Sequence, residues 1–274
     1  MTIQERISEI KQKVAPIQGW VFDEAGAKLY ELVRFHTPNG TVVELGSWKG
    51  RSTVWLAHAV MDRGDGVVYA VDTWKGTATE EGHQQLLSGY KENQLFEEFR
   101  RNLTNAGVYP GVIAIQGDTV EVSNRFPKNL PIGLLFIDAC HDYPAVKEDF
   151  ERWSPMVAEG GYIVFDDVPS WEGPTRFVAE LPPSYKIRSI QHNQCIVKKM
   201  KESDIRIADI LQHLYQKEGP AFVAEAYKEL LNREPEEEGL LGHVQLLAGG
   251  MGKQGIVSGI VQSAEAAQLY HRGR

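Results

Sequence analysis

The sequence predicts an α/β fold in which a mostly parallel sheet carries helices on both faces. Short apolar segments alternate with helical patterns five times within residues 42–165. These segments are apolar at successive positions, as expected for parallel strands buried on both faces. Acidic residues follow four of the predicted strands, at the edge of the sheet where ligands bind in open α/β folds. We therefore expect a ligand site at this edge.

The first 40 residues predict two helices. Apolar residues recur at helical spacing from Ile3 to Val14, which predicts an amphipathic helix over residues 2–14. Asp23 can cap a second helix over about residues 24–35. We expect residues 1–19 to serve either as a lid over the site or as a dimer contact.

Five strands are predicted at residues 42–45, 67–71, 112–115, 134–137 and 162–165. Gly46 ends the first strand, and a helix over residues 53–60 follows Gly50. Residues 185–190 and 194–198 are predicted to form an antiparallel pair that closes the series. Residues 73–94 are polar and fit no regular element, as is typical of a loop that walls a binding site.

The last 72 residues predict a separate helical domain. No strand pattern occurs after Met200, and helices are expected at about residues 204–217, 220–232, 237–248 and 253–262. Glycine and proline separate these helices. The predicted domains are therefore residues 1–202 and residues 203–274.

Composition excludes several classes of function. The net charge is −8 and no basic run is present, which argues against binding to nucleic acid. We expect no membrane span, because no apolar run approaches the required length. The two cysteines, Cys140 and Cys195, do not form a disulfide framework or a zinc site. With no signal pattern at the N-terminus, the predicted compartment is the cytoplasm.

Three acids at successive strand ends indicate a nucleoside ligand. Gly46 and Gly50 would let a ligand approach the backbone and a helix N-terminus closely. Asp72 is placed to accept hydrogen bonds from ribose hydroxyls, and Asp118 to hold an adenine amino group. Each acid alone is more often a solvated or capping residue. Together with Glu44, in this order, they predict a ligand that carries adenosine.

Five segments together resemble class I S-adenosylmethionine-dependent methyltransferases. They are VVELGSWKG (42–50), YAVDTWKG (69–76), QGD (116–118), FIDACH (136–141) and GGYIVFDD (160–167). The DTWKG and DD segments are similar to one branch, which includes metal-dependent sugar O-methyltransferases of macrolide biosynthesis. The resemblance covers about residues 20–200. It implies a Rossmann-like sheet of seven strands, mostly parallel, with an antiparallel last strand.

The resemblance also implies that S-adenosylmethionine is the cofactor. Gly46 and Ser47 would approach its methionine part, Ser52 or Thr53 its carboxylate, and Trp74 its adenosine. The residues implied to bind it are Glu44, Gly46, Ser47, Ser52, Thr53, Asp72, Thr73, Trp74 and Asp118.

Asp138, Asp166 and Asp167 are candidate metal ligands. Two neighbouring strand ends would bring these carboxylates together, where their charges repel unless a cation is bound. Oxygen ligands suit Mg²⁺, with Mn²⁺ or Ca²⁺ as alternatives. The related enzymes hold substrate hydroxyls on such a metal. The competing interpretation is a solvated loop start at Asp166 and Asp167.

His141 is the candidate catalytic base, acting beside Asp138. It occupies the position of a lysine base in the catechol-type relatives, and imidazole titrates near neutral pH. A surface histidine that caps the next helix is an equally simple interpretation. His192 and His83 are alternative bases.

The predicted reaction is methyl transfer from S-adenosylmethionine to a hydroxyl of a sugar or glycan. Two alternatives stay open: methylation of a phenolic or catechol natural product, and a non-catalytic scaffold that binds the cofactor. Residues 226–239 and 261–265 resemble a small helical domain of bacterial surface and glycan-modifying proteins. That resemblance implies a homo-oligomer, or docking to glycan-assembly enzymes, through residues 203–274.

Overall fold

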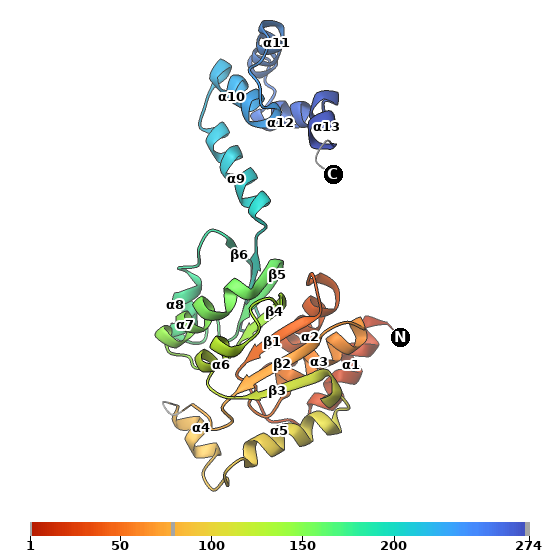
Figure 1. The fold of residues 1–274 in the computed structure, drawn as a ribbon, viewed down its shortest axis with the longest axis vertical. Helices are drawn as coiled ribbons and strands as arrows, with labels where there is room; N and C mark the ends of the chain where they lie inside the picture. The colour runs from red at the N-terminus through yellow and green to blue at the C-terminus, as the bar shows by residue number, and fades with distance from the viewer. Residues whose placement is uncertain (1, 78–79, 272–274) are drawn as a thin grey trace. The chain divides into compact units, whose positions relative to one another are not determined.

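The computed structural model describes residues 2–77 and 80–271, without the side chains of residues 81, 206–208, 267 and 269–271 (Figure 1). The chain divides into two compact units, Met1–Lys201 and Glu202–Arg274. The first unit holds the sheet and the second is helical. In the part of the chain that is described, no helix has both the length and the apolar character needed to cross a membrane.

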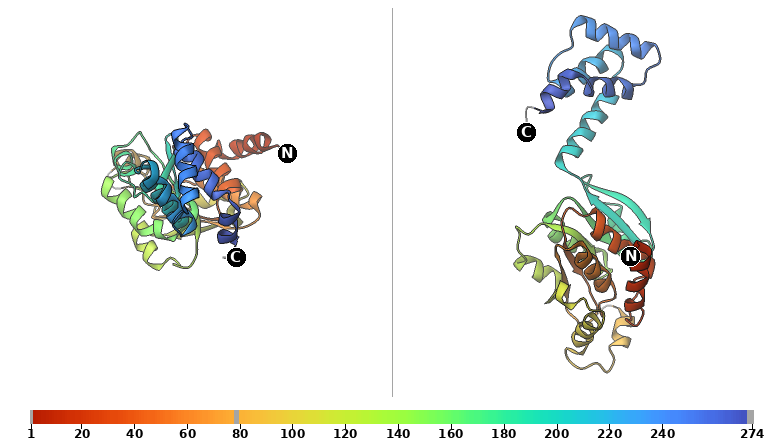
Figure 2. Two further views of the ribbon diagram at one scale, coloured as in Figure 1. Left: turned by 90° about the horizontal axis from the view of Figure 1, so that it is seen from above. Right: turned by 90° about the vertical axis from the view of Figure 1, so that its right-hand side faces the viewer.

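The first unit is built on a seven-stranded sheet in the order β3-β2-β1-β4-β5-β7-β6. Strands β1 to β5 run parallel, and β7 runs antiparallel to both of its neighbours. The right-hand view of Figure 2 shows the β6–β7 ribbon along one edge. The predicted fold class is confirmed, including the reversed strand. The strands are β1 (Thr41–Leu45), β2 (Val67–Asp72), β3 (Val112–Gln116), β4 (Ile132–Ile137), β5 (Val157–Phe165), β6 (Tyr185–Gln191) and β7 (Gln194–Lys199).

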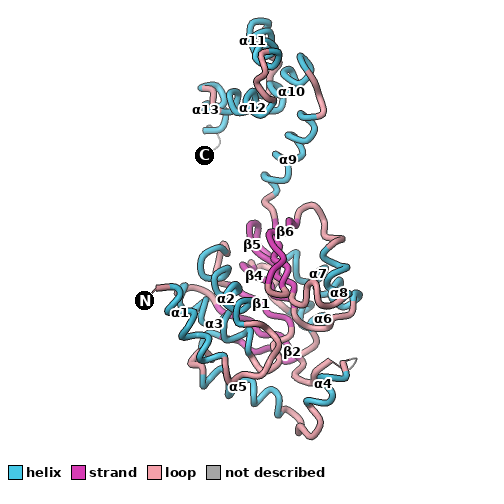
Figure 3. The backbone as a smooth tube through the Cα atoms, turned by 180° about the vertical axis from the view of Figure 1, so that it is seen from behind, coloured by secondary structure: helices cyan, strands magenta, loops and turns pink. Residues whose placement is uncertain are grey.

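Helices cover both faces of this sheet (Figure 3). Side chains alternate between the faces, so Leu134 belongs to one apolar cluster and Leu135 to the other. This is why the strands are apolar at every position. One face carries α1 (Ile3–Val14), α2 (Asp23–Glu31), η1 (Leu32–His36), α3 (Arg51–Arg63) and α5 (Gln94–Asn105). The other carries α6 (Thr119–Arg125), α7 (Tyr143–Trp153) and α8 (Glu172–Val178).

Helix α1 is part of the core of the first unit. Ile10 and Val14 are fully buried. The Arg6 guanidinium donates to both carboxylate oxygens of Asp62 on α3, at 2.7 and 2.9 Å. Tyr30 on α2 donates to the same carboxylate at 2.8 Å. These contacts hold α1, α2 and α3 together. The α1–α2 linker therefore begins at a helix that is packed into the core of the first unit.

Three α-helices, α4, α8 and α13, occur where the sequence pattern indicated none. Helix α4 (Glu81–Leu86) lies within residues 73–94, of which 78 and 79 are outside the described residues. Its sequence lacks apolar periodicity, and the following Leu87 packs against the core of the first unit. In the second unit, α13 follows the four predicted helices, and Ser263 Oγ accepts from the Ala266 N–H at 3.2 Å at its start.

The second unit contains a small core of its own. Phe222, Val223, Ile256 and Ile260 are almost fully buried at its centre. Its helices are α9 (Glu202–Tyr215), α10 (Gly219–Leu231), α11 (Glu237–Ala248), α12 (Lys253–Val261) and α13 (Ala264–His271). The two remaining short helices, η2 (Tyr109–Gly111) and η3 (Ser154–Met156), belong to the first unit.

Candidate functional site

A cavity of about 740 Å³ lies at the carboxyl ends of the parallel strands. Strands β1 to β5 each contribute a lining residue at their last residue or within two residues after it. Gly46 follows β1, Asp72 ends β2, Gly117 follows β3, Asp138 follows β4 and Asp167 lies two residues after β5. The acids predicted at Asp72, Asp118, Asp138 and Asp167 therefore meet in one space.

The loop between β1 and α3 forms the floor of this cavity. Gly46 has φ +84°, and a Cβ there would lie 1.9 Å from the backbone oxygen of Asp138. Gly50 is also left-handed, at φ +90°, and precedes the first turn of α3. Gly46, Ser47 and Ser52 line the cavity as predicted. Gly46 donates its N–H to the Val71 backbone oxygen at 2.9 Å, and Gly50 donates to the Ser47 backbone oxygen at 2.8 Å, so the left-handed glycines shape a loop that is hydrogen-bonded within the protein.

Asp72 fixes this loop as well as facing the cavity. Its Oδ2 accepts from the backbone N–H groups of Ser47 and Trp48, both at 2.8 Å. Its Oδ1 accepts from the Trp74 N–H at 2.6 Å. A carboxylate has about four lone-pair positions, so three are used within the protein. Besides the predicted ribose contact, Asp72 therefore has a role in shaping the loop.

Glu44 lies beneath the loop and does not line the cavity. It is fully buried, and its Oε2 accepts from Ser47 Oγ at 2.7 Å and from Thr53 Oγ1 at 2.5 Å. Burial raises the pKa of Glu44 to about 7, and hydrogen bonds from Ser52, Thr53 and Ser47 offset burial only in part. The structure shows Glu44 supporting the loop from below, and its direct contact with a cofactor stays a prediction.

Replacing Glu44 with Gln should stabilise the protein relative to wild type as the pH rises. The native carboxyl keeps its proton up to about pH 7, whereas the unfolded one ionises near 4.5. The stability that this proton contributes is full below the unfolded pKa and is lost as the pH rises through the folded pKa. The variant should therefore gain about 2–3 kcal/mol on wild type between pH 5 and pH 8.

Thermal unfolding of both proteins at pH 5 and pH 8 measures this difference. A difference in melting temperature that does not change with pH would show that Glu44 is already ionised in the folded state.

Thr53 and Trp74 also lie outside the cavity lining. Thr53 is fully buried on Glu44. The Trp74 ring packs on Phe96 and Phe99 at 4.5 and 4.9 Å, and its Nε1 donates to the Trp48 backbone oxygen at 2.9 Å. Thr53 and Trp74 thus take part in packing and loop support, and their cofactor contacts stay predictions. Trp74 is drawn inward because the preceding strand ends at Asp72, whose carboxylate holds its N–H.

Thr73 and Asp118 do line the cavity. Asp118 is the N-cap of α6, where its Oδ1 accepts from the N–H groups of Val120 and Glu121 at 2.9 and 3.2 Å. The capping role and the predicted ligand contact are compatible, since the second carboxylate oxygen makes neither of these bonds.

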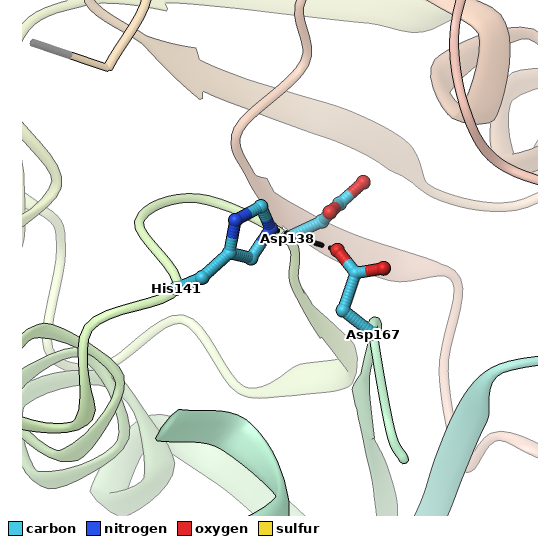
Figure 4. A group of neighbouring side chains, drawn as sticks. All are labelled: Asp138, His141 and Asp167. Atoms are coloured by element: carbon cyan, nitrogen blue, oxygen red, sulfur yellow. Dashed lines mark ion pairs between the residues drawn. The ribbon is translucent and has the colours of Figure 1, made fainter. Parts of the chain in front are cut away.

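Asp138, His141 and Asp167 form a compact group at the other end of the cavity (Figure 4). One ligand atom from each residue lies within 4.8 Å of the others, close enough to hold one metal ion. Asp138 follows β4, His141 lies three residues later, and Asp167 comes from the loop after β5. Asp167 has φ +60°, which is unusual for a residue with a side chain.

Asp166 is not a member of this group and does not line the cavity. It is 7% exposed, and its Oδ1 has no hydrogen-bond partner among the described residues. Burial and the charge of Asp167 raise the pKa of Asp166 to about 7. Burial and the charges of Asp166 and Asp167 likewise raise the pKa of Asp138 well above its usual value.

These acids have the properties expected of residues that hold a divalent cation. Like charges are buried side by side, and a cation would offset their repulsion. Two carboxylates and an imidazole are ligands for several divalent metals, and carboxylate oxygens alone suit Mg²⁺. Metal binding by Asp138, Asp166 and Asp167 stays a prediction, with Asp166 now the least accessible of the three.

His141 is held between two carboxylates. Its Nε2 lies 2.7 Å from Asp167 Oδ2 and its Nδ1 lies 2.8 Å from Glu80 Oε1. The ring stacks on Trp171 with centroids 4.3 Å apart. Burial lowers the pKa of His141, but the contacts with Asp167 and Glu80 outweigh burial and leave it raised. His141 therefore lies at the metal-ligand edge, as expected for the base.

The two alternative bases lie elsewhere. His192 is exposed in the β6–β7 turn and does not line the cavity. His83 lines it and stacks on Trp48, with ring centroids 4.8 Å apart. Burial lowers the pKa of His83. His83 is thus a wall residue whose Nδ1 already accepts from the Thr77 N–H at 3.2 Å.

Several residues at the site carry no sequence signal. Asn193 donates from Nδ2 to Asp167 Oδ1 at 2.8 Å and so positions that carboxylate from the β6–β7 turn. Trp20 lines the cavity beside Trp48 and His83. Glu80 reaches His141 from residues 73–94. Each depends on contacts between distant parts of the chain, which local patterns do not reveal.

Arg51 attaches the α1–α2 linker, residues 15–22, to the cavity floor. Its guanidinium donates to the backbone oxygens of Val21, Ile17 and Val14, at 2.8, 2.9 and 3.3 Å. It also donates to Asp23 Oδ1 at 2.6 Å. Because Gly19, Trp20 and Val21 line the cavity, this linker is a wall held in place by four hydrogen bonds.

Residues 43–168 match a family model described as a methyltransferase domain, and residues 209–270 match one described as a domain of unknown function (DUF4214).

Solved structures share the fold of the first unit. A Klebsiella pneumoniae protein described as an O-methyltransferase is 19% identical and has a TM-score of 0.52, over 73% of this chain and 91% of that one. The methyltransferase PaMTH1 of Podospora anserina, bound to S-adenosylhomocysteine (SAH), is 13% identical with a TM-score of 0.52, over 72% and 88%. Cofactor-bound Rv0187 from MTB is 18% identical with a TM-score of 0.50, over 73% and 90%.

Proposed function

We propose that this protein is an S-adenosylmethionine-dependent O-methyltransferase that methylates a hydroxyl of a sugar or glycan with the help of a divalent cation, Mg²⁺ first. The observation that carries the proposal is the shared cavity. The glycine loop and Asp72 lie at one end of it, and Asp138, His141 and Asp167 lie at the other. A donor and an acceptor bound at these two ends would be neighbours.

Each end has chemistry suited to its reactant. When bound, S-adenosylmethionine supplies the methyl group and the cation makes the acceptor hydroxyl more acidic. Gly46, Ser47 and Ser52 line the end of the cavity where the donor would bind, and Asp72 and Asp118 would face its nucleoside part. Asp138 and Asp167 would hold the cation, together with Asp166 if its side chain turns. His141 would take the proton of the hydroxyl.

The side chains that line the cavity indicate which class of acceptor it could bind. Trp20, Trp48 and His83 make an aromatic surface, with ring centroids 4.8 to 5.4 Å apart. Glu80 and Asp142 add acceptors for hydroxyl groups to the same lining. Aromatic faces beside carboxylates suit a polyhydroxylated ring, which supports the sugar. The same aromatic surface also supports the second candidate, a phenolic or catechol acceptor.

The helical domain enters the proposal as a docking or oligomerisation element. The family model that it matches is described as a domain of unknown function, and its buried side chains build its own core. We infer that residues 203–274 serve a homo-oligomer or bind glycan-assembly enzymes, with the protein acting in the cytoplasm on a small-molecule or glycan acceptor.

Binding and product formation test the proposal in two steps. Calorimetric titration with S-adenosylmethionine and SAH should show saturable binding. A mass-spectrometric screen over sugars, glycans and phenols, with and without Mg²⁺, should then yield a product heavier by one methylene group. A phenol methylated in preference to every sugar would select the second candidate. Binding of S-adenosylmethionine without any product would leave the non-catalytic scaffold, and absence of both binding and product would refute the proposal.

A further inference from the structure

Helix α7 carries an acidic residue on its buried, apolar face. Four residues of this helix are buried at helical spacing: Val146, Asp149, Phe150 and Trp153. Asp149 is only 2% exposed, whereas the preceding Glu148 is exposed. A carboxyl group at an apolar core position costs free energy unless another group satisfies it. Packing alone therefore does not account for Asp149 at this position.

The Asp149 carboxyl is only partly satisfied within the protein. Its Oδ1 has no hydrogen-bond partner among the described residues. Burial raises the pKa of Asp149 to about 7, and a hydrogen bond from the Thr119 side chain offsets burial only in part. The nearby charges of Asp118 and Glu148 raise the pKa further, and neither residue is a candidate metal ligand. A buried acid of this kind beside a cavity is typical of a binding site.

Asp149 lies in the part of the cavity where the nucleoside of the donor is proposed to bind. It lines the cavity together with Asp118 and Thr119, at the start of α6. Helices α6 and α7 pack side by side (Figure 1), and Trp153 Nε1 donates to the Thr119 backbone oxygen at 3.2 Å. Rotation about the Cβ–Cγ bond exchanges the two oxygens of the Asp149 carboxyl. Oδ1 can therefore be turned toward the space that Asp118 also lines.

We propose that Asp149 recognises the base of the methyl donor by accepting a hydrogen bond from the 6-amino group of adenine. The inference rests on the proposed function, in which adenosine is part of the donor. A carboxyl group has an acceptor oxygen whether it is ionised or protonated, and the amino group of adenine is a donor. That amino group has two N–H bonds, so Asp118 and Asp149 can each accept one. A base without it would leave Asp149 buried and unpaired.

Calorimetric titration of the full-length protein with SAH and with its 6-deamino analogue, in which hydrogen replaces the amino group, tests the inference. Wild type should bind SAH about 5- to 100-fold more tightly, because the analogue leaves a buried acceptor unpaired. Asp149→Ala should weaken SAH binding by about 5- to 100-fold and change binding of the analogue by less than about threefold. Asp149→Asn keeps an acceptor oxygen and should retain most of the preference for SAH.

Glu151→Ala is the matched control, because Glu151 is an exposed acid of the same helix outside the cavity lining. It should bind both ligands as wild type does. Thermal unfolding without ligand shows whether each variant is folded. If Asp149→Ala is unfolded, Asp149→Leu takes its place, since an apolar side chain suits this core position and also removes the acceptor.

The outcomes separate this inference from the proposed function. Equal affinity of wild type for SAH and the analogue would overturn the inference and leave the proposed function standing. An equal loss of both ligands in Asp149→Ala would also overturn it, because that result is expected if Asp149 only supports Thr119. A preference for SAH that depends on Asp149, in a protein that methylates no acceptor, would uphold the inference while the proposed function fails. Absence of binding to either ligand would refute both.

Discussion

Replacing Asp138 with Asn should lower methyl transfer by at least ~100-fold and remove its response to Mg²⁺. The amide keeps the shape of the side chain but loses the charge that a cation needs. Burial and the neighbouring acids raise the pKa of Asp138, which means that ionising this carboxyl in the wild-type protein costs free energy. The same substitution should therefore leave the free energy of unfolding unchanged or raise it. Asp167→Asn should lower the rate of methyl transfer to a similar extent.

Initial rates with and without EDTA, together with thermal unfolding, measure both effects. Asp65→Asn is a matched control, because Asp65 is an exposed acid that pairs with Arg63 away from the cavity. It should retain wild-type rates. Full activity of Asp138→Asn and Asp167→Asn, combined with insensitivity to EDTA, would rule out the metal and would leave His141 as the base on its own.

Replacing Gly46 with Ala should unfold or strongly destabilise the first unit. A left-handed residue with a Cβ costs about 1–2 kcal/mol. At Gly46 the Cβ would also lie 1.9 Å from the backbone oxygen of Asp138, which cannot move without displacing β4. Together these effects should reach about 3–5 kcal/mol, a fall in melting temperature of roughly 6–20 °C. Binding of S-adenosylmethionine should be lost with the loop.

Gly64→Ala separates the two causes. Gly64 has φ +86°, almost the angle of Gly46, but no atom lies within 4 Å of its added Cβ. It should show the conformational cost alone, about 1–2 kcal/mol by differential scanning calorimetry. Equal destabilisation by the two substitutions would mean that the loop shifts to accept the methyl group and that the close approach to Asp138 is not rigid.

The order of elements was predictable because it depends on local patterns. Uniformly apolar strands predicted a parallel sheet with helices on both faces. Acids at the ends of β2 and β4 predicted the edge of the sheet at which a ligand would bind. The direction of a side chain was harder to predict. Glu44 and Asp72 both occur near strand ends, yet Glu44 points below the loop and Asp72 into the cavity. Strand residues alternate between faces, and a strand that ends one residue earlier or later directs its last side chain to the other face.

Contacts across the chain were not predictable from spacing. Asn193 lies 26 residues after Asp167, and Glu80 lies 61 residues before His141. Their partners are set by the docking of the β6–β7 turn and of residues 73–94 on the sheet edge. Helix α4 was missed for the same reason, since tertiary contacts rather than its own apolar periodicity hold it.

The attachment of the α1–α2 linker by Arg51 has a consequence for synthesis on the ribosome. Every group that Arg51 binds precedes it in the chain, so the linker can dock once α3 has formed. The strands next to it, β1, β2 and β3, also come first and occupy one side of the sheet, while β4, β5, β7 and β6 follow on the other. Because domains emerge N-terminus first, the donor side of the cavity can take shape before Asp138 and Asp167 have been translated.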